Sequence, residues 1–346
     1  MPLLATARAV DLLKETADMV GLDGRVAARF SAIQAIFDPE LAYVEAELRA
    51  AAAGGEKPAN DAGLHLVRAG GKRVRPLTVL LSAACFGKVP DGARELAVVA
   101  ELVHSATLLH DDVIDDSSER RGDRAARKVW GNAISVLAGD LLLTHALDRT
   151  LRAAPLALPE LLLTLRRLVD GEVVQLRGRA KLDPTEATYF RILEDKTASL
   201  FGWAARAGAI VAGAPPGELA PLAAFGERMG IAFQLVDDAL DYAGDAREMG
   251  KTLLSDLAEG KVTLPLVLAL GRDPNLSCEL ARARAGDRAA AEALGETVRA
   301  MGVCEEVRRR AARETERALS ALAEVRPSPA REMLRVLATE LTARTR

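Results

Sequence analysis

Long stretches rich in Ala and Leu, interrupted at intervals by Gly and Pro, make up most of this 346-residue chain. Runs of β-branched residues are few, and such a pattern favours helices over sheet. The interruptions mark where one helix ends and the next begins, because Gly and Pro both destabilise a helix interior. The pattern therefore predicts an all-α fold.

Gly, Pro and capping residues predict the helix boundaries. Asp38-Pro39 is typical of an N-cap followed by Pro at the first helical position. The polar stretches 116–132 and 244–260 are predicted to be loops, the first with some helical turn, and 213–217 is a break. Helices are predicted at about 38–52, 76–86, 92–115, 133–152, 159–179, 183–212 and 218–242, with several more in the C-terminal third.

The composition excludes several classes of protein. A hydrophobic content of 49% is ample for a large core, and a net charge of −3 provides no basic field for nucleic acid. Charges interrupt residues 1–20, and no uncharged apolar run approaches the roughly 20 residues that span a bilayer. Cys85, Cys278 and Cys304 form no Cys-x-x-Cys pair and are typical of thiols in a reducing cytoplasm. We therefore expect a cytoplasmic protein whose membrane contact is at most peripheral.

No linker rich in Pro, Gly or Ser divides the chain. We therefore predict one domain over residues 1–346, with residues 1–25 loosely attached.

The motif Asp-Asp-x-x-Asp occurs twice, each time at the C-terminal end of an apolar helix. Residues four apart share a helical face, so the first and last Asp of each motif project together. Three carboxylates at a helix C-terminus repel one another and oppose the helix dipole. One such cluster fits a solvated helix end equally well, but two identical clusters indicate Mg²⁺ bound together with phosphate. The candidate metal ligands are Asp111, Asp112, Asp115, Asp237, Asp238 and Asp241.

Basic residues recur beside flexible glycines. Gly70-Gly-Lys-Arg-Val-Arg-Pro76 precedes a predicted helix start, where an anion is favoured, although it lacks the spacing of a Walker P-loop. Alone, this segment is more often an exposed basic turn. Arginine forks bind phosphate in bidentate fashion, and two of them directly follow the first aspartate motif. The candidate cations are Lys72, Arg75, Arg120, Arg121, Lys196, Lys251 and Lys261.

The segment Glu101-x-x-His104 matches half of a di-iron carboxylate motif. The required second Glu-x-x-His is missing, so a di-iron site is rejected. His104 lies two helical turns before Asp111 on the same face. It is either a core histidine or a hydrogen-bond donor to a phosphate.

Taken in order over about residues 38–270, these motifs resemble the trans-isoprenyl diphosphate synthase (polyprenyl synthetase) family. One departure is the segment 122–127, where the family more often has a turn resembling Pro-Thr. The matching segments are Gly70-Gly-Lys-Arg-x-Arg-Pro76, Glu101-Leu-x-His104, Asp111-Asp-x-x-Asp115, Arg120-Arg-Gly122, Gly139-Asp140, Gly171-Glu-x-x-Gln175, Lys196-Thr197, Phe233-Gln-x-x-Asp-Asp-x-x-Asp241, Gly250-Lys-Thr252 and Gly260-Lys261.

The resemblance implies a fold and roles for these residues. The fold would be a single-domain bundle of about ten or more helices around a central apolar cavity, with residues 271–346 forming C-terminal helices. The chain would act as a homodimer on isopentenyl diphosphate and an allylic diphosphate. The roles are isopentenyl diphosphate binding by Lys72, Arg75, His104 and Arg121; allylic diphosphate binding by Arg120, Lys196, Lys251 and Lys261; catalysis by Lys196, Thr197, Gln234 and Lys251; and binding of about three Mg²⁺ by the six aspartates.

The implied reaction is head-to-tail (1'-4) condensation. Residues four, five and eight before Asp111 are Thr107, Ala106 and Val103, and none is bulky enough to close a tunnel for the growing chain. One isoprene unit is about one helical turn long, so we expect a product of about forty to fifty carbons, as in quinone tails. Alternatively, Leu142, His145 or Ala146 closes the tunnel at about twenty carbons, as in a geranylgeranyl or farnesyl diphosphate synthase.

Two other functions remain alternatives. A class I terpene cyclase also ionises allylic diphosphates, but it needs no second diphosphate site and would usually contain more aromatic residues. A non-catalytic subunit of a heteromeric synthase commonly lacks one aspartate motif, whereas both are intact here.

Overall fold

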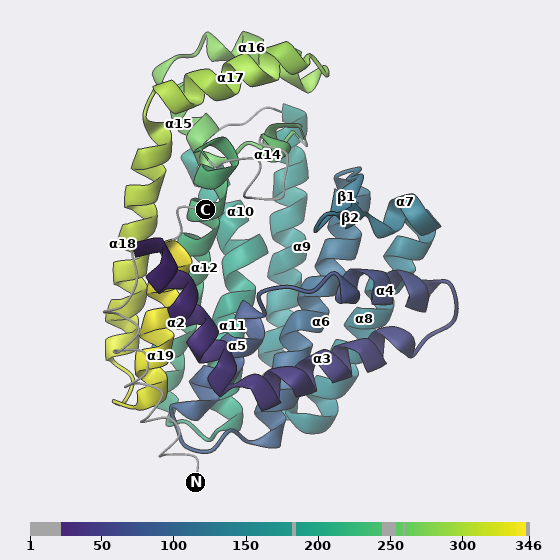
Figure 1. The fold of residues 1–346 in the computed structure, drawn as a ribbon, viewed down its shortest axis with the longest axis vertical. Coiled ribbons are helices and arrows are strands. Elements are labelled where there is room, and N and C mark those ends of the chain that lie inside the picture. The colour runs from purple at the N-terminus through teal and green to yellow at the C-terminus, as the bar shows by residue number, and fades with distance from the viewer. Residues whose placement is uncertain (1–21, 182–184, 244–253, 259, 344–346) are drawn as a thin grey trace.

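The structure, a computed structural model, describes residues 22–181, 185–243, 254–258 and 260–343 (Figure 1). Nearly all of these residues are helical, which confirms the predicted all-α fold. The strands β1 (Glu119–Arg120) and β2 (Asp123–Arg124) form one small antiparallel hairpin. The first helices are α2 (Leu22–Ile36), α3 (Asp38–Ala53), α4 (Ala59–Arg68), α5 (Val74–Ala84) and α6 (Asp91–Ile114).

Among the described residues, the middle of the chain forms six further α-helices. They are α7 (Ala126–Trp130), α8 (Asn132–Ala153), α9 (Leu158–Lys181), α10 (Glu186–Leu193), α11 (Ser199–Val211) and α12 (Pro216–Ala243), with the short turns η1 (Pro155–Ala157) and η2 (Glu194–Ala198). The C-terminal helices are α14 (Ser255–Ala258), α15 (Leu264–Arg272), α16 (Leu276–Arg284), α17 (Arg288–Ala300), α18 (Val303–Ala323) and α19 (Pro329–Thr342).

The core forms where α5 and α11 meet the long helices α6 and α12. Most residues of α5 and α11 are buried. Gly208 allows α11 to approach α5 closely, because a Cβ there would lie 2.2 Å from the carbonyl oxygen of Val79. The helices α8 and α18 pack on the outer sides of α6 and α12, and α16 and α17 lie together at one end of the molecule (Figure 1). This framework fixes α6 and α12, which carry the two aspartate motifs.

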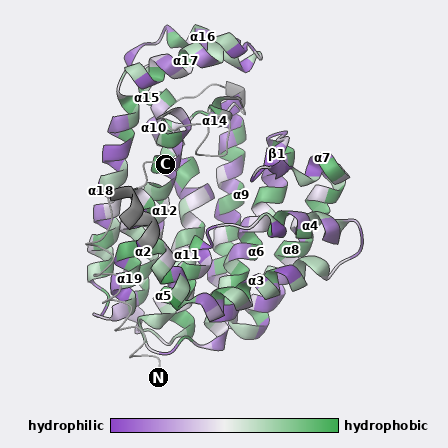
Figure 2. Ribbon diagram, viewed as in Figure 1, coloured by the Kyte–Doolittle hydropathy of each residue, from purple (hydrophilic) through white to green (hydrophobic). Residues whose placement is uncertain are grey.

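Four parts of the fold differ from the predicted boundaries. Helix α4 was not predicted, because the short amphipathic segment contains Gly63 and follows Pro58. The predicted helix 183–212 is divided into α10 and α11 by the π-helical turn η2. The predicted loop 116–132 contains the β1–β2 hairpin and α7, and Figure 2 colours that hairpin as hydrophilic. Helix α2 covers part of the predicted loose segment 1–25, of which residues 1–21 lie outside the described residues.

Large apolar side chains are exposed along α8 and α9. Leu137, Leu162 and Leu163 are more than half exposed, and Val169 is 62% exposed. Exposed apolar side chains gathered on two helices are typical of an interaction surface. Among the described residues, no helix is both long and apolar enough to cross a membrane.

Candidate active site

A cavity of about 1480 Å³ lies between α6, α9, α10, η2, α12 and the segment after α14. Both aspartate motifs contribute to its lining, although they are more than 120 positions apart in the sequence. The lining combines charged side chains with apolar groups that include Leu108, Leu168 and Phe233. The cavity can therefore hold an anionic group together with a hydrocarbon.

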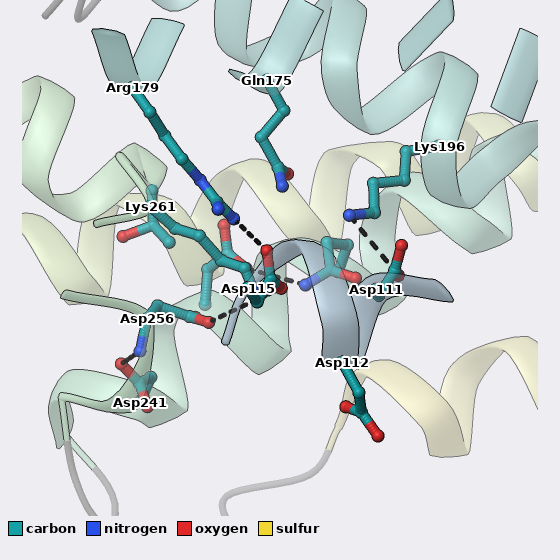
Figure 3. Close-up of polar contacts among 12 residues, drawn as sticks. Asp111, Asp112, Asp115, Gln175, Arg179, Lys196, Asp241, Asp256 and Lys261 are labelled. Atoms are coloured by element: carbon teal, nitrogen blue, oxygen red, sulfur yellow. Dashed lines mark hydrogen bonds and ion pairs between the residues drawn. The ribbon is translucent and has the colours of Figure 1, made fainter. Parts of the chain in front are cut away.

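Asp111 and Asp115 at the end of α6 face into this cavity. Lys196 Nζ lies 3.5 Å from Asp111 Oδ2, and Arg179 Nη2 lies 2.6 Å from Asp115 Oδ1 (Figure 3). Lys261 Nζ lies 3.1 Å from Asp115 Oδ2. Burial raises the pKa of Asp111 despite the charge of Lys196. Burial also opposes ionisation of Asp115, but the charges of Lys261 and Arg179 outweigh the effect of burial, so the pKa of Asp115 is lowered.

Asp112 has a different environment from its two companions. Its side chain points away from Asp111 and Asp115 (Figure 3), and it is not part of the cavity lining. Arg120 Nε donates a hydrogen bond to Asp112 Oδ1 at 2.8 Å. The side chain of Asp112 is buried, whereas that of Arg120 is partly exposed. The expected metal ligand Asp112 is therefore placed as a partner of Arg120, because residues adjacent in a helix project about 100° apart.

The second motif presents Asp237, Asp238 and Asp241 to the same cavity. Asp238 is buried and accepts hydrogen bonds from Gln234 Nε2 at 2.8 Å and from the Tyr189 hydroxyl at 2.6 Å. Burial, and then the charge of Asp256, raises the pKa of Asp238 to about 8. Asp241 accepts a hydrogen bond from the backbone N–H of Asp256 at 3.3 Å (Figure 3). These contacts fix the carboxylates of α12 from two sides.

The basic residues expected to bind isopentenyl diphosphate also converge on this cavity. Lys72, Arg75, His104 and Arg121 all contribute to the lining. The guanidinium of Arg75 stacks 4.4 Å from the centre of the Phe201 ring, and burial lowers its pKa to about 10. Burial, and then the charges of Arg75 and Arg121, lowers the pKa of His104 well below its usual value. Cations that lie close together and repel one another in this way favour a bound anion.

Arg73 anchors the segment that carries these cations. It is 6% exposed and forms ion pairs at 2.5 Å with both Glu45 and Glu101. It begins α5 in a left-handed conformation with φ = 52°. Arg121 Nη1 donates to the carbonyl oxygen of Gly70. Glu101 of the Glu101-x-x-His104 segment is thus an ion-pair partner of Arg73.

The turn η2 brings two expected catalytic residues to the cavity. Lys196 and Thr197 both contribute to its lining, and the Thr197 hydroxyl lies 3.4 Å from Gln234 Oε1. Lys196 also pairs with Glu172 of α9. π-Helical turns are frequent at functional sites, because they change the direction of side chains within a helix. Lys251 lies outside the described residues.

The three residues expected to line a product tunnel do not share one environment. Thr107 is part of the cavity lining, whereas Val103 and Ala106 are 0% and 2% exposed and lie within the helix core. The prediction treated all three as one wall. Ala106 projects about 100° away from its neighbour Thr107, whereas Val103 lies one turn before Thr107 on the same face of α6, and the tunnel role of all three stays a prediction.

Several lining residues were not among the predicted site residues. Glu172, Gln175 and Arg179 recur at three- and four-residue spacing and so share one face of α9. That spacing could have identified them once α9 was predicted to face the aspartates. Tyr189 and Asp256 come from separate segments, and no local pattern marks them.

The donor set fits a hard divalent cation. Asp115 Oδ2 is buried and, among the described residues, has only Lys261 Nζ beside it, at 3.1 Å, so this carboxylate oxygen can also coordinate a metal ion. Within the described part of the chain, no three acidic, His or Cys side chains are close enough together to bind one metal ion as they stand. Asp111 and Asp115 instead have Lys and Arg partners, which an incoming metal ion would displace.

Comparison with known proteins gives consistent matches. Residues 56–301 match the family model described as polyprenyl synthetase. The chain is 38% identical over 256 residues to an octaprenyl diphosphate synthase from Escherichia coli, covering 73% of this chain and 79% of that protein. It is 36% identical to a Caulobacter crescentus polyprenyl synthase solved with calcium and isoprenyl diphosphate, with a TM-score of 0.85 and coverage of 91% and 98%. It is 34% identical to a decaprenyl diphosphate synthase from Rhodobacter capsulatus, with a TM-score of 0.83 and coverage of 92% and 99%.

Proposed function

The chain belongs to the polyprenyl synthetase family, and we propose that it is a prenyltransferase that makes a long all-trans polyprenyl diphosphate. It condenses isopentenyl diphosphate head to tail (1'-4) with an allylic diphosphate. One observation carries this assignment: both aspartate motifs and a separate group of cations line the same cavity. Two diphosphates can thus be held beside apolar groups of one cavity.

The aspartates form the allylic site. Asp111 and Asp115 from α6 and Asp237 and Asp241 from α12 would hold about three Mg²⁺, since carboxylates with phosphate oxygens are the environment that Mg²⁺ prefers. Calcium in the related Caulobacter crescentus protein supports a divalent ion. Mg²⁺ supplies Lewis-acid stabilisation of the departing diphosphate.

The cations of the chain complete that site. Lys196 and Lys261 lie beside the carboxylates of α6 and would donate to diphosphate oxygens as the C–O bond breaks. Lys251 would join them. Asp112 fixes the guanidinium of Arg120, which lines the cavity, so we assign Asp112 a positioning role and Arg120 the contact with the diphosphate.

The second diphosphate would bind to Lys72, Arg75, His104 and Arg121. His104 is neutral at pH 7 because of its lowered pKa, and a neutral imidazole can still donate one N–H to a phosphate oxygen. A dianion in this pocket would relieve the repulsion among the arginines. This second site argues against a terpene cyclase, which needs none.

The reacting carbons would lie between these two sites. Thr197 and Gln234, linked at 3.4 Å, present hydroxyl and carbonyl dipoles that can face the allylic cation. The double bond of isopentenyl diphosphate attacks this cation, and the proton that is lost passes to the departing pyrophosphate. None of these steps requires a nucleophilic Ser or Cys.

The growing chain would extend along the apolar lining past Thr107. The related octaprenyl and decaprenyl diphosphate synthases support a product of about forty to fifty carbons, at roughly one helical turn per isoprene unit. Such a chain suits a quinone tail, and it would leave through peripheral contact with a membrane.

The exposed apolar face of α8 and α9 supports a homodimer, because a face of this kind is costly to leave in water. We assign the protein to the cytoplasm, since Cys85, Cys278 and Cys304 are all free thiols.

The assay uses the purified chain alone with farnesyl diphosphate, isopentenyl diphosphate and Mg²⁺, followed by mass analysis of the product. We expect consumption of isopentenyl diphosphate and a polyprenyl diphosphate of about forty to fifty carbons. Cyclised product without consumption of isopentenyl diphosphate would indicate a terpene cyclase. Activity only after a second protein is added would indicate a subunit of a heteromeric synthase.

A further inference from the structure

Arg179 is a cation of the cavity that none of the matched motifs includes. It lies near the C-terminal end of α9, contributes to the cavity lining, and its side chain is 14% exposed. Its Nη2 lies 2.6 Å from Asp115 Oδ1 (Figure 3). Its carbonyl oxygen accepts a hydrogen bond from Arg284 of α16 at 2.5 Å, which holds this end of α9 in place.

Gln175 of α9 links Arg179 to Lys196 of η2. With its amide oriented toward the donors, the oxygen of Gln175 accepts from Arg179 Nη2 at 3.0 Å and from Lys196 Nζ at 3.2 Å. Lys196 in turn lies beside Asp111, and Arg179 beside Asp115. Each inward-facing carboxylate of the first motif therefore has a cation directly opposite it on the α9 side.

The guanidinium also has donor capacity that the described residues do not use. Its Nε is buried and makes no hydrogen bond to them. A guanidinium has five N–H donors, arranged as a fork that matches phosphate oxygens. A buried donor of this kind is costly unless an acceptor arrives, and a diphosphate in the cavity would provide one.

We propose that Arg179 is a further binding residue for the allylic diphosphate. It pairs with Asp115 before substrate arrives and donates to a diphosphate oxygen once a divalent ion shares that carboxylate. This inference rests on the proposed function, since it requires a diphosphate beside the first aspartate motif.

The test is isothermal titration of the full chain with inorganic pyrophosphate at saturating Mg²⁺. We expect Arg179→Gln to weaken pyrophosphate binding roughly 10- to 100-fold, the usual range for a lost charge-assisted hydrogen bond. Arg179→Lys should retain part of the affinity. The control is Arg177→Gln, an exposed arginine on the same helix, which should bind within about twofold of wild type. Steady-state kinetics should show a raised KM for the allylic substrate in Arg179→Gln and an unchanged KM for isopentenyl diphosphate.

Two results would overturn the inference. One is wild-type pyrophosphate affinity in Arg179→Gln; tighter binding of Mg²⁺ alone to that variant would then show that Arg179 only competes with the metal. The other is an equal loss in Arg177→Gln, which would indicate a general effect of charge. If wild type itself bound no pyrophosphate, the proposed function would fail as well, so the two failures are distinguishable. Thermal unfolding of each variant checks that it folds.

Discussion

Replacing Gly171 by Ala should displace the catalytic turn. Gly171 is buried where α9 packs against η2, and a Cβ there would lie 2.9 Å from the backbone nitrogen of Lys196 and 3.0 Å from Asp195 Cβ. Favourable contacts begin at about 3.5 Å, so η2 has to move by roughly 0.5 Å or more. Backbone atoms cannot rotate away as the end of a side chain can.

The size of the effect follows from a matched control. Gly178 lies on the same helix, and a Cβ there would meet nothing within 4 Å. Gly178→Ala should stabilise the protein by about 1 kcal/mol, the usual helix preference for Ala over Gly. Gly171→Ala gains the same preference but loses about 1–3 kcal/mol through overpacking. The free energies of unfolding of the two variants should therefore differ by about 1–3 kcal/mol.

The same displacement should lower turnover. Lys196 and Thr197 would move with η2, and misplacement by about 1 Å costs on the order of 100-fold, so we expect kcat of Gly171→Ala to fall roughly 10- to 100-fold. Urea unfolding and steady-state consumption of isopentenyl diphosphate measure both effects. If Gly171→Ala were as stable as Gly178→Ala and kept wild-type kcat, the close packing of α9 on η2 would play no part in catalysis.

Three further predictions concern the carboxylates and the tunnel. Asp111→Ala or Asp237→Ala should lower turnover at least roughly 100-fold without unfolding the protein, and normal activity in a folded variant would rule out the metal role. Thr107→Phe should shorten the product because Thr107 lines the cavity, whereas Ala106→Phe would overpack the core. Chromatography of the dephosphorylated products measures chain length in both variants. Unchanged product length in Thr107→Phe would contradict the tunnel model. Asp238 has a pKa raised to about 8, so the folded protein binds a proton there that the unfolded chain loses near pH 4. Without Mg²⁺, the free energy of unfolding of wild type should therefore fall relative to that of Asp238→Asn as pH rises from about 5 to about 8. The slope is at most about 1.4 kcal/mol per pH unit. Parallel curves of unfolding free energy against pH for the two proteins would contradict this.

The sequence predicted the helices and motifs that have strong local signals. The helix start at Asp38-Pro39, the long helix that ends at the first aspartate motif, and the presence of both motifs at helix ends all agree with the structure. The predicted N-cap was wrong, because Phe37 precedes the helix and Asp38 is its first residue. Helix α4 was missed because it is short and interrupted by Gly63. The turn η2 was also missed, because a π-helical turn arises from packing against α9 and not from local propensity.

The site shows where local patterns stop being sufficient. The motif grouped Asp112 with Asp111 and Asp115, but helix geometry turns Asp112 away from them, and its partner Arg120 comes from the hairpin after α6. Arg179 lies opposite Asp115 only because α9 returns alongside α6. Such pairings between distant segments have no signature in a single sequence.

The central claim is that both aspartate motifs bind one metal–pyrophosphate group inside a single cavity. Crystals of the protein with Mn²⁺ and pyrophosphate test this directly, because anomalous scattering locates each ion. We expect ions bound by Asp111 and Asp115 on one side and by Asp237 on the other, all contacting the same pyrophosphate. Ions bound to only one motif, or pyrophosphate outside the cavity, would contradict the account.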